Sequence, residues 1–183
     1  MKLAVLFPGI GYTCARPLLY YAGKLAAERG YQILSVEYGE LPRNVKGSPE
    51  RMRLAFDIAC ERTEAALERV DWAAQEDVLF IGKSIGTAVA TRYAARHGLN
   101  VRFVLLTPLA QTFDGMAGEA VAFHGTADPW ADTGAIRAAC EARGIPLYLT
   151  EGANHSLETG NVEADIETLS ETMRVVRKFI GQR

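Results

Sequence analysis

Six short apolar runs, separated by longer helical patterns, constrain the fold of this chain more than any other feature. Each run is nearly continuous in Val, Leu, Ile and Phe and does not alternate between apolar and polar residues. Strands buried on both faces have this composition, which is typical of parallel sheets covered by helices. The predicted strands are residues 2–7, 31–36, 77–82, 101–106, 119–124 and 145–150.

Helical patterns fill the intervals between these strands. The predicted helices are residues 15–29, 49–71, 84–97, 131–143 and 164–181. Gly30, Gly98 and Gly144 each follow one of these patterns, as glycines at helix C-terminal caps do. Parallel strands joined by helices wind with right-handed crossovers, so the sequence predicts an α/β fold, a three-layer doubly wound sandwich. At 183 residues, we expect residues 1–183 to form one domain.

Composition argues against several classes of function. The net charge is −2 and the basic residues are scattered, so neither nucleic acid nor a membrane surface is an expected partner. No apolar run is long enough for a membrane span or a secretory segment, and the expected location is therefore the cytoplasm. Cys14, Cys60 and Cys140 lack the spacing of metal or disulfide motifs, so we expect no metal and no cofactor.

In a doubly wound sheet, ligands bind at the loops that leave the carboxyl ends of the strands. The segment "GKSIG" at 82–86 lies in one of these loops and admits two interpretations. A phosphate-binding loop requires a glycine five residues before Gly82, where this chain has Asp77, and the residues between them are strand formers. A G-x-S-x-G turn between a strand and a helix instead holds a nucleophilic serine, which predicts Ser84 as a nucleophile.

A serine nucleophile needs a base, and the chain has three histidines. His97 ends a helical pattern, where an imidazole is a common cap, and His124 closes a strand, where packing or a hydrogen bond beneath the loop is expected. His155 lies in the polar loop "TEGANHSLE", directly after the last predicted strand. This position shares the rim of the sheet with Ser84, so His155 is the predicted base.

The acid that orients this base is predicted to be Asp128, in "HGTADPW" after the fifth strand. Asp132 is a rival, but it begins a helix and fits an N-cap better. Glu151 and Glu158 flank the histidine and are equally well explained as solvated surface. The order Ser, Asp, His along the chain is one of the orders in which catalytic triads occur.

Acyl transfer also needs backbone donors for the oxyanion. One is predicted to be the amide of Ile85, which follows the nucleophile. The second is predicted in "FPGIGYT", at the amide of Ile10, with Gly11 and Tyr12 as alternatives. A dinucleotide-binding turn at this place would need a third glycine where the chain has Cys14, so that interpretation is weak.

Several rim residues are candidates for substrate binding. Tyr12, Phe113, Trp130 and Leu157 could line an acyl or alcohol pocket, or could equally cover the edge of the sheet. Lys83, Arg16 and Arg43 could select an anionic substrate, although a solvated role is the more common one for basic residues. A buried cysteine at a helix start is the expected state of Cys14.

With "GKSIG", "HGTADP" and "NHSL" in this order, and "PGIG" after the first strand, the chain resembles the α/β-hydrolase superfamily. It is similar to the small, lidless members related to dienelactone hydrolases and short esterases. The resemblance implies a six-stranded all-parallel sheet of order 2-1-3-4-5-6, without the first two strands of the family. Because residues 107–118 are only a loop where relatives insert a lid, it also implies an open, shallow site.

Dienelactone hydrolases carry cysteine at the nucleophile position, whereas this chain has Ser84. The residues and the resemblance together predict a serine hydrolase that cleaves a small carboxylic ester, thioester or lactone through an acyl-enzyme intermediate. The alternative is a small-molecule-binding protein without catalysis on the same scaffold, because a fold does not determine a function.

Overall fold

A six-stranded parallel sheet forms the centre of the computed structural model, which describes residues 1–182. The strands are β1 (Lys2–Phe7), β2 (Gln32–Ser35), β3 (Asp77–Lys83), β4 (Arg102–Leu106), β5 (Ala120–Gly125) and β6 (Leu147–Thr150). Their order across the sheet is β2-β1-β3-β4-β5-β6, and every neighbouring pair is parallel. The predicted fold class, strand order and direction are confirmed.

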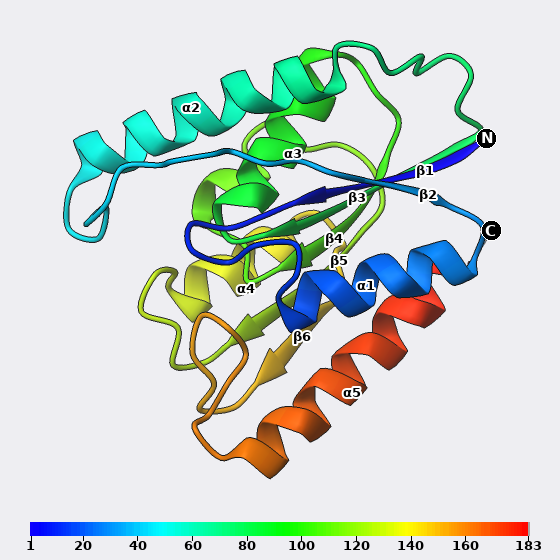
Figure 1. The fold of residues 1–183 in the computed structure, drawn as a ribbon. Coiled ribbons are helices and arrows are strands. Elements are labelled where there is room, and N and C mark those ends of the chain that lie inside the picture. Colours follow the sequence, from blue (N-terminus) through cyan, green and yellow to red (C-terminus); the bar gives the residue numbers. More distant parts are fainter. Residues whose placement is uncertain (183) are drawn as a thin grey trace.

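Helices cover both faces of this sheet, which gives three layers (Figure 1). Helices α1 (Pro17–Glu28) and α5 (Val162–Ile180) lie side by side on one face. Helices α2 (Pro49–Leu67), α3 (Ile85–Arg96) and α4 (Thr133–Glu141) lie on the other face. Gly30, Gly98 and Gly144 have φ values of 83°, 62° and 64°, which agrees with their predicted positions at helix ends.

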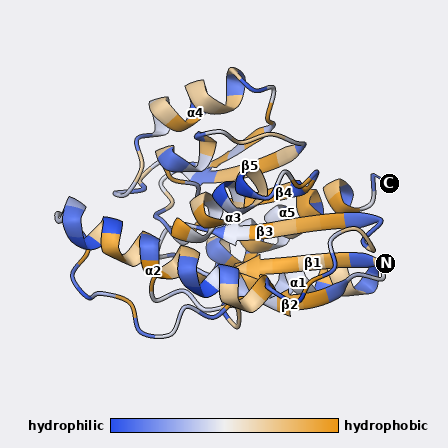
Figure 2. Ribbon diagram, turned by 90° about the horizontal axis from the view of Figure 1, so that it is seen from above, coloured by the Kyte–Doolittle hydropathy of each residue, from blue (hydrophilic) through white to orange (hydrophobic). Residues whose placement is uncertain are grey.

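The core is divided by the sheet into two apolar clusters, and the central strands supply residues to both. In β3, Phe80 packs with Ile85 of α3, whereas Leu79 and Ile81 pack with α1 and α5 on the opposite face. Side chains alternate along a strand, so a strand covered by helices on both faces has to be apolar throughout. Figure 2 shows these central strands as the most hydrophobic part of the ribbon.

Burial on both faces does not extend to the two edge strands. Three of the four residues of β2 are exposed, and β6 is half-buried with Tyr148 exposed. Each edge strand has a neighbour on one side only, so its apolar run alone overstates its burial. Residues 107–118, expected to be a loop, also contain a short 3-10 helix, η1 (Ala110–Phe113).

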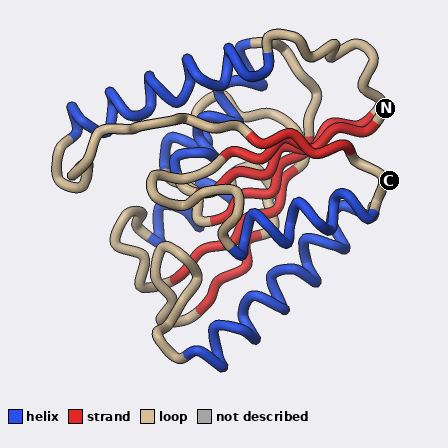
Figure 3. Tube along the Cα trace, viewed as in Figure 1, coloured by secondary structure: helices blue, strands red, loops and turns tan. Residues whose placement is uncertain are grey.

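The loops that follow the carboxyl ends of the strands gather at one rim of the sheet (Figure 3). In the register of β1 with β3, Phe7 lies opposite Gly82, so the loop after β1 lies beside Ser84. None of the helices described in residues 1–182 combines the length and the apolar character that a membrane span requires.

Candidate active site

Ser84 occupies a sharp turn between β3 and α3, with a φ of 58°. This conformation is strained for a residue with a side chain, and such strain is found most often at functional sites. The two glycines of the motif make the turn possible. A Cβ at Gly86 would lie 2.3 Å from the carbonyl oxygen of Phe7, and one at Gly82 would lie 2.8 Å from the Cα of Thr87. Larger residues at either position would push the nucleophile out of place.

The structure brings Ser84, His155 and Asp128 together from three different loops. His155 Nε2 lies 2.6 Å from Ser84 Oγ, and His155 Nδ1 lies 2.6 Å from Asp128 Oδ2. The backbone amide of Trp130 donates to Asp128 Oδ1 at 2.8 Å, so both carboxylate oxygens have partners. With Nδ1–H donating to the aspartate, Nε2 is free to accept the serine proton.

The environment of these groups favours a neutral base beside an ionised acid. Burial is the largest influence on His155 and lowers its pKa; the hydrogen bond to Asp128 opposes this lowering, and the nearby charge of Lys83 adds to it. Burial raises the pKa of Asp128, but the hydrogen bonds from His155 and from the Trp130 amide outweigh it, so the pKa falls below its usual value. Near neutral pH, His155 is therefore able to accept a proton.

The other two histidines lie where their expected structural roles place them. His97 follows the last residue of α3, and its Nε2 lies 2.8 Å from Glu64 Oε2. His124 is completely buried at the end of β5, and its Nε2 lies 3.0 Å from Thr133 Oγ1. His124 Nδ1, however, faces Asp128 Oδ2 at 3.7 Å, so this imidazole is next to the triad, which the sequence did not indicate.

Two segments next to Ser84 can supply the oxyanion donors. Ile85 is the first residue of α3, and the first amides of a helix have no acceptor within it. The loop after β1 presses against the nucleophile, because a Cβ at Gly9 would lie 3.3 Å from the Cβ of Ser84. The Tyr12 amide already donates to the carbonyl of Gly9 at 3.3 Å, which leaves Ile10, with Gly11, as the better candidate.

Lys83 was expected to be a solvated lysine at the rim, but it is only 2% exposed. It is the last residue of β3, and its Nζ lies 4.9 Å from the centre of the Tyr12 ring. Burial lowers the pKa of Lys83 to about 7, although Asp128 and Glu158 oppose this shift. Tyr12 is also held in place, since its hydroxyl accepts a hydrogen bond from the amide of Leu18 at 3.1 Å.

The remaining rim candidates divide into exposed and buried residues. The Trp130 ring is partly exposed and lies 5.8 Å from the His155 ring, so it borders the triad. Phe113 and Leu157 are buried in the core, where they cover the sheet. Arg16 and Arg43 are exposed. Cys14 was expected to be buried at a helix start, but it is only half-buried and lies in the turn before α1; this partial burial raises the pKa of its thiol.

Asp132 caps α4, as expected, by accepting a hydrogen bond from the amide of Ala135 at 2.8 Å. Two threonines that sequence analysis missed connect η1 to the nucleophile. Thr87 Oγ1 donates to the carbonyl of Ser84 at 2.6 Å and lies 2.6 Å from Thr112 Oγ1. Only their three-dimensional proximity reveals this connection.

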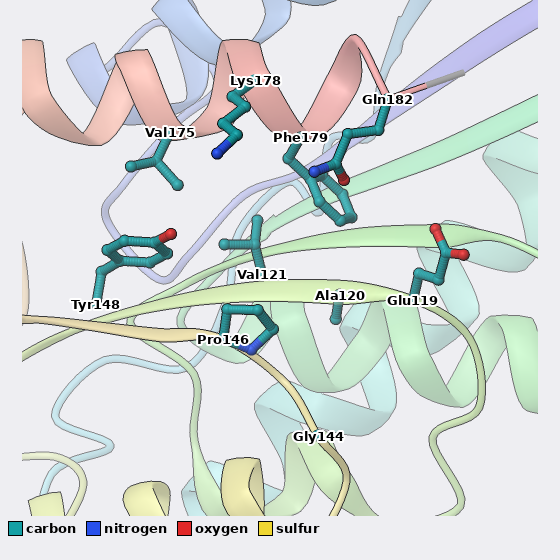
Figure 4. A pocket seen from close by; sticks show the side chains of 10 residues that line it. All are labelled: Glu119, Ala120, Val121, Gly144, Pro146, Tyr148, Val175, Lys178, Phe179 and Gln182. Atoms are coloured by element: carbon teal, nitrogen blue, oxygen red, sulfur yellow. The ribbon is translucent and has the colours of Figure 1, made fainter.

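A groove of about 880 Å³ opens between α2, α3 and η1, and Ile85 forms part of its lining. A second cavity, of about 260 Å³, lies at the opposite end of the sheet between the starts of β5 and β6 and the end of α5 (Figure 4). Its lining includes Tyr148 and Lys178 but no pair of nucleophile and base. Within residues 1–182, no group of three or more His, Cys, Asp or Glu side chains is arranged to hold a metal ion.

Sequence comparison with protein-family models and with curated proteins finds no match. Comparison with solved structures finds clear similarity at low sequence identity. Est1E from Butyrivibrio proteoclasticus is 12% identical with a TM-score of 0.69, over 98% of this chain and 86% of that one. An α-β serine hydrolase homologue from Coxiella burnetii is 15% identical with a TM-score of 0.67, over 97% and 84% of the two chains.

A serine hydrolase without a lid from Xanthomonas campestris is 14% identical with a TM-score of 0.62, over 100% of this chain and 84% of that one. These structures share the arrangement of strands and helices described above, and at this level of identity the similarity concerns the fold. The chain therefore has the α/β-hydrolase fold, in the lidless form that its motifs resemble.

Proposed function

We propose that this protein is a serine hydrolase that cleaves a small carboxylic ester through an acyl-enzyme intermediate. The observation that carries the proposal is the continuous contact from Asp128 through His155 to Ser84, with 2.6 Å at each step. Thioesters and lactones present the same carbonyl chemistry and belong to the same proposal. The expected partner is a small molecule, while the absence of nucleic-acid and membrane partners and the cytoplasmic location stay predictions.

In the first half of the reaction, Ser84 Oγ attacks the ester carbonyl while His155 Nε2 takes its proton. The oxyanion of the tetrahedral intermediate accepts hydrogen bonds from the Ile85 and Ile10 amides. The intermediate collapses, the C–O bond to the alcohol breaks, and His155 gives its proton to the leaving alkoxide. Asp128 holds the imidazole in the required tautomer and stabilises its positive charge.

In the second half, a water molecule attacks the acyl-enzyme, and His155 accepts a proton from it. Collapse of the second intermediate breaks the bond between the acyl carbon and Ser84 Oγ, and the proton returns from His155 to the serine. The products are a carboxylic acid and an alcohol, so the atoms of ester and water are conserved. Apart from the ester and the water, every group that acts in this route belongs to the chain.

Labelling with a fluorophosphonate tests the proposal directly, because this reagent phosphonylates only an activated serine. We expect one adduct on the folded protein, located at Ser84, and none on the Ser84→Ala variant. A folded protein that is not labelled, that turns over no p-nitrophenyl ester, and whose melting temperature rises with a ligand would support the non-catalytic binding protein instead. Est1E has been solved with ferulic acid bound, so a hydroxycinnamate ester belongs in the substrate panel.

A further inference from the structure

The groove between α2, α3 and η1 has a volume of about 880 Å³, and its lining includes Ile85, the residue that follows Ser84 in the chain. We propose that this groove binds the acyl chain of the ester, and that the preferred substrates carry an uncharged chain of medium length. This inference rests on the proposed function and adds a substrate class to it. A volume of this size matches pockets that bind small organic ligands and far exceeds what an acetyl group would fill.

The chemistry of the groove favours an aliphatic chain. Its apolar lining comes from Met52 and Phe56 of α2, Ile85 and Ala88 of α3, and Leu109 before η1. Along α3 the lining continues from Ile85 to Arg92, a length of roughly 10 Å at the rise of an α-helix. An extended chain of about eight carbons has a similar length, given the C–C bond distance.

Charges at the groove are mixed and do not select a charged substrate. Its edge carries two arginines, Arg53 and Arg92, together with three acidic residues, Glu50, Asp57 and Asp114. The guanidinium of Arg92 lies 5.7 Å from the centre of the Phe56 ring, so it already has an aromatic partner. A carboxylate or an ammonium group on the acyl chain would meet charges of both signs.

Hydrogen bonds connect the groove to the nucleophile. Thr87 donates to the carbonyl of Ser84 at 2.6 Å, and Thr112 Oγ1 lies 2.6 Å from Thr87 Oγ1. The amide of Leu109, which lines the groove, donates to Thr112 Oγ1 at 3.1 Å. These bonds hold the wall of the groove at a constant position relative to the backbone of Ser84, as a specificity pocket requires.

The test compares kcat/KM for p-nitrophenyl octanoate and p-nitrophenyl acetate. We expect the protein to prefer octanoate by at least tenfold, since each fully buried methylene contributes about a fourfold gain. Filling the groove with Ala88→Leu or Met52→Trp is expected to remove most of this preference, measured as the ratio of kcat/KM for the two esters in each variant. Leu54→Trp is the control, because Leu54 lies on the same helix, is 52% exposed and does not line the groove.

An octanoate preference that both groove variants leave unchanged, with acetate still hydrolysed, would overturn the groove assignment and leave the proposed function standing. Acetate turnover with no octanoate preference would do the same. The loss of turnover for all esters, together with failure of Ser84 to react with the fluorophosphonate, would instead overturn the proposed function and this inference with it.

His124 Nδ1 is buried without a hydrogen-bond partner among the described residues, and it faces Asp128 Oδ2 at 3.7 Å. This observation is independent of the groove and carries a second inference. We infer that His124 is a positioning residue, which presents Nδ1–H to the carboxylate and stabilises its ionised form. The distance is too long for a hydrogen bond, but the N–H dipole acts on the charge in a fully buried environment.

Thr133 lies where its hydroxyl can complement the tautomer that this role needs. Its hydroxyl lies 3.0 Å from His124 Nε2 and can donate to it, which leaves the ring proton on Nδ1. The opposite tautomer would direct the Nδ1 lone pair at the carboxylate. Burial lowers the pKa of His124, so the ring is neutral at pH 7 and a tautomer has to be chosen. Asp128 acts on both histidines and raises their pKa values. Asp132 also raises the pKa of His124, whereas His155 lowers it, and Lys83 lowers the pKa of His155.

The test is the pH profile of kcat/KM for His124→Leu and His124→Asn. Leucine removes the N–H, which makes the electrostatic potential at His155 more negative and raises the pKa of His155. The acidic limb of the kcat/KM profile should therefore move up by about half a pH unit. Asparagine keeps a donor toward Asp128 and should restore the limb. Thr133→Val should shift the limb in the same direction and Thr133→Ser should not. If the limb stays at the same pH in both the leucine and the valine variants, His124 has only a packing role.

Discussion

The two ends of β3 each carry a buried ionisable residue, and the two residues differ in the contacts that surround them. Asp77, the first residue of β3, lies 2.8 Å from Arg102 and receives a hydrogen bond from the Tyr31 hydroxyl. Arg102 also donates to the carbonyl of Phe179 at 2.9 Å. At the last residue, the ammonium of Lys83 has the Tyr12 ring as its contact and no hydrogen bond or ion pair within residues 1–182. The first arrangement is a satisfied network, and the second leaves a cation unpaired.

Backbone strain follows the same division. The rim next to Lys83 holds Ser84 and Thr107 with φ values of 58° and 47°, and the buried Thr107 Oγ1 has no hydrogen-bond partner within the described chain. Unfavourable features of this kind persist where surrounding structure over-determines them, which is typical of functional sites. One end of the sheet therefore has the contacts of a stabilising network, while the other end has the features expected of the proposed active site.

The largest expected effect is on activity at the rim. Ser84→Ala removes the attacking oxygen, so kcat should fall by about 10⁴- to 10⁶-fold. Thermal unfolding should change little, because the Ser84 hydroxyl contributes to catalysis and not to core packing. Ester turnover and melting temperature, measured on one preparation, check both parts. Substantial residual turnover in the alanine variant would mean that another group is the nucleophile.

At the opposite end, Arg102→Met should lower stability and spare the reaction. It leaves the Asp77 carboxylate buried without its guanidinium, which costs about 3–5 kcal/mol. Urea unfolding measures this loss, and the double variant Asp77→Asn/Arg102→Met should recover part of it. Below the unfolding transition, kcat should stay within about twofold of the parent protein. A large fall in kcat in folded protein would contradict the division between the two ends.

Lys83→Met should make the rim more stable around pH 6 to 7, by roughly 1–3 kcal/mol. The folded-state pKa of Lys83 is about 7, below its ordinary value of 10.5, because burial disfavours the charge. Between these two values the unfolded chain binds more protons, so the stability of the parent protein should rise with pH from about 7 toward 10.5. Urea unfolding across this range should show the slope in the parent protein and lose it in the methionine variant.

The smallest expected effect is a shift in the pH dependence of hydrolysis. The reaction needs neutral His155, whose pKa burial lowers below 6.5, so the acidic limb of kcat/KM should lie below pH 6.5. Lys83→Met removes a nearby positive charge and should raise the pKa of His155, moving this limb upward by less than about one pH unit. A limb that does not move would show that the Lys83 charge does not reach the base.

Local patterns in the sequence were sufficient for the framework and for the loop positions of Ser84, Asp128 and His155. Apolar runs and helical periodicity predict all six strands and five helices, because burial on both faces dictates composition over a whole element. G-x-S-x-G predicts the turn at Ser84 because its geometry is local. The loop positions of Asp128 and His155 follow from strand order alone, since parallel strands end at one rim.

Features that depend on what packs against a loop required the tertiary structure. Lys83 is buried and Phe113 and Leu157 face the core because distant segments cover them, and no residue near them in sequence reveals this. The groove beside Ile85 and the contact of His124 with Asp128 arise where separate elements meet. Periodicity reports the average environment of an element, whereas the partner of a single side chain depends on contacts between residues far apart along the chain.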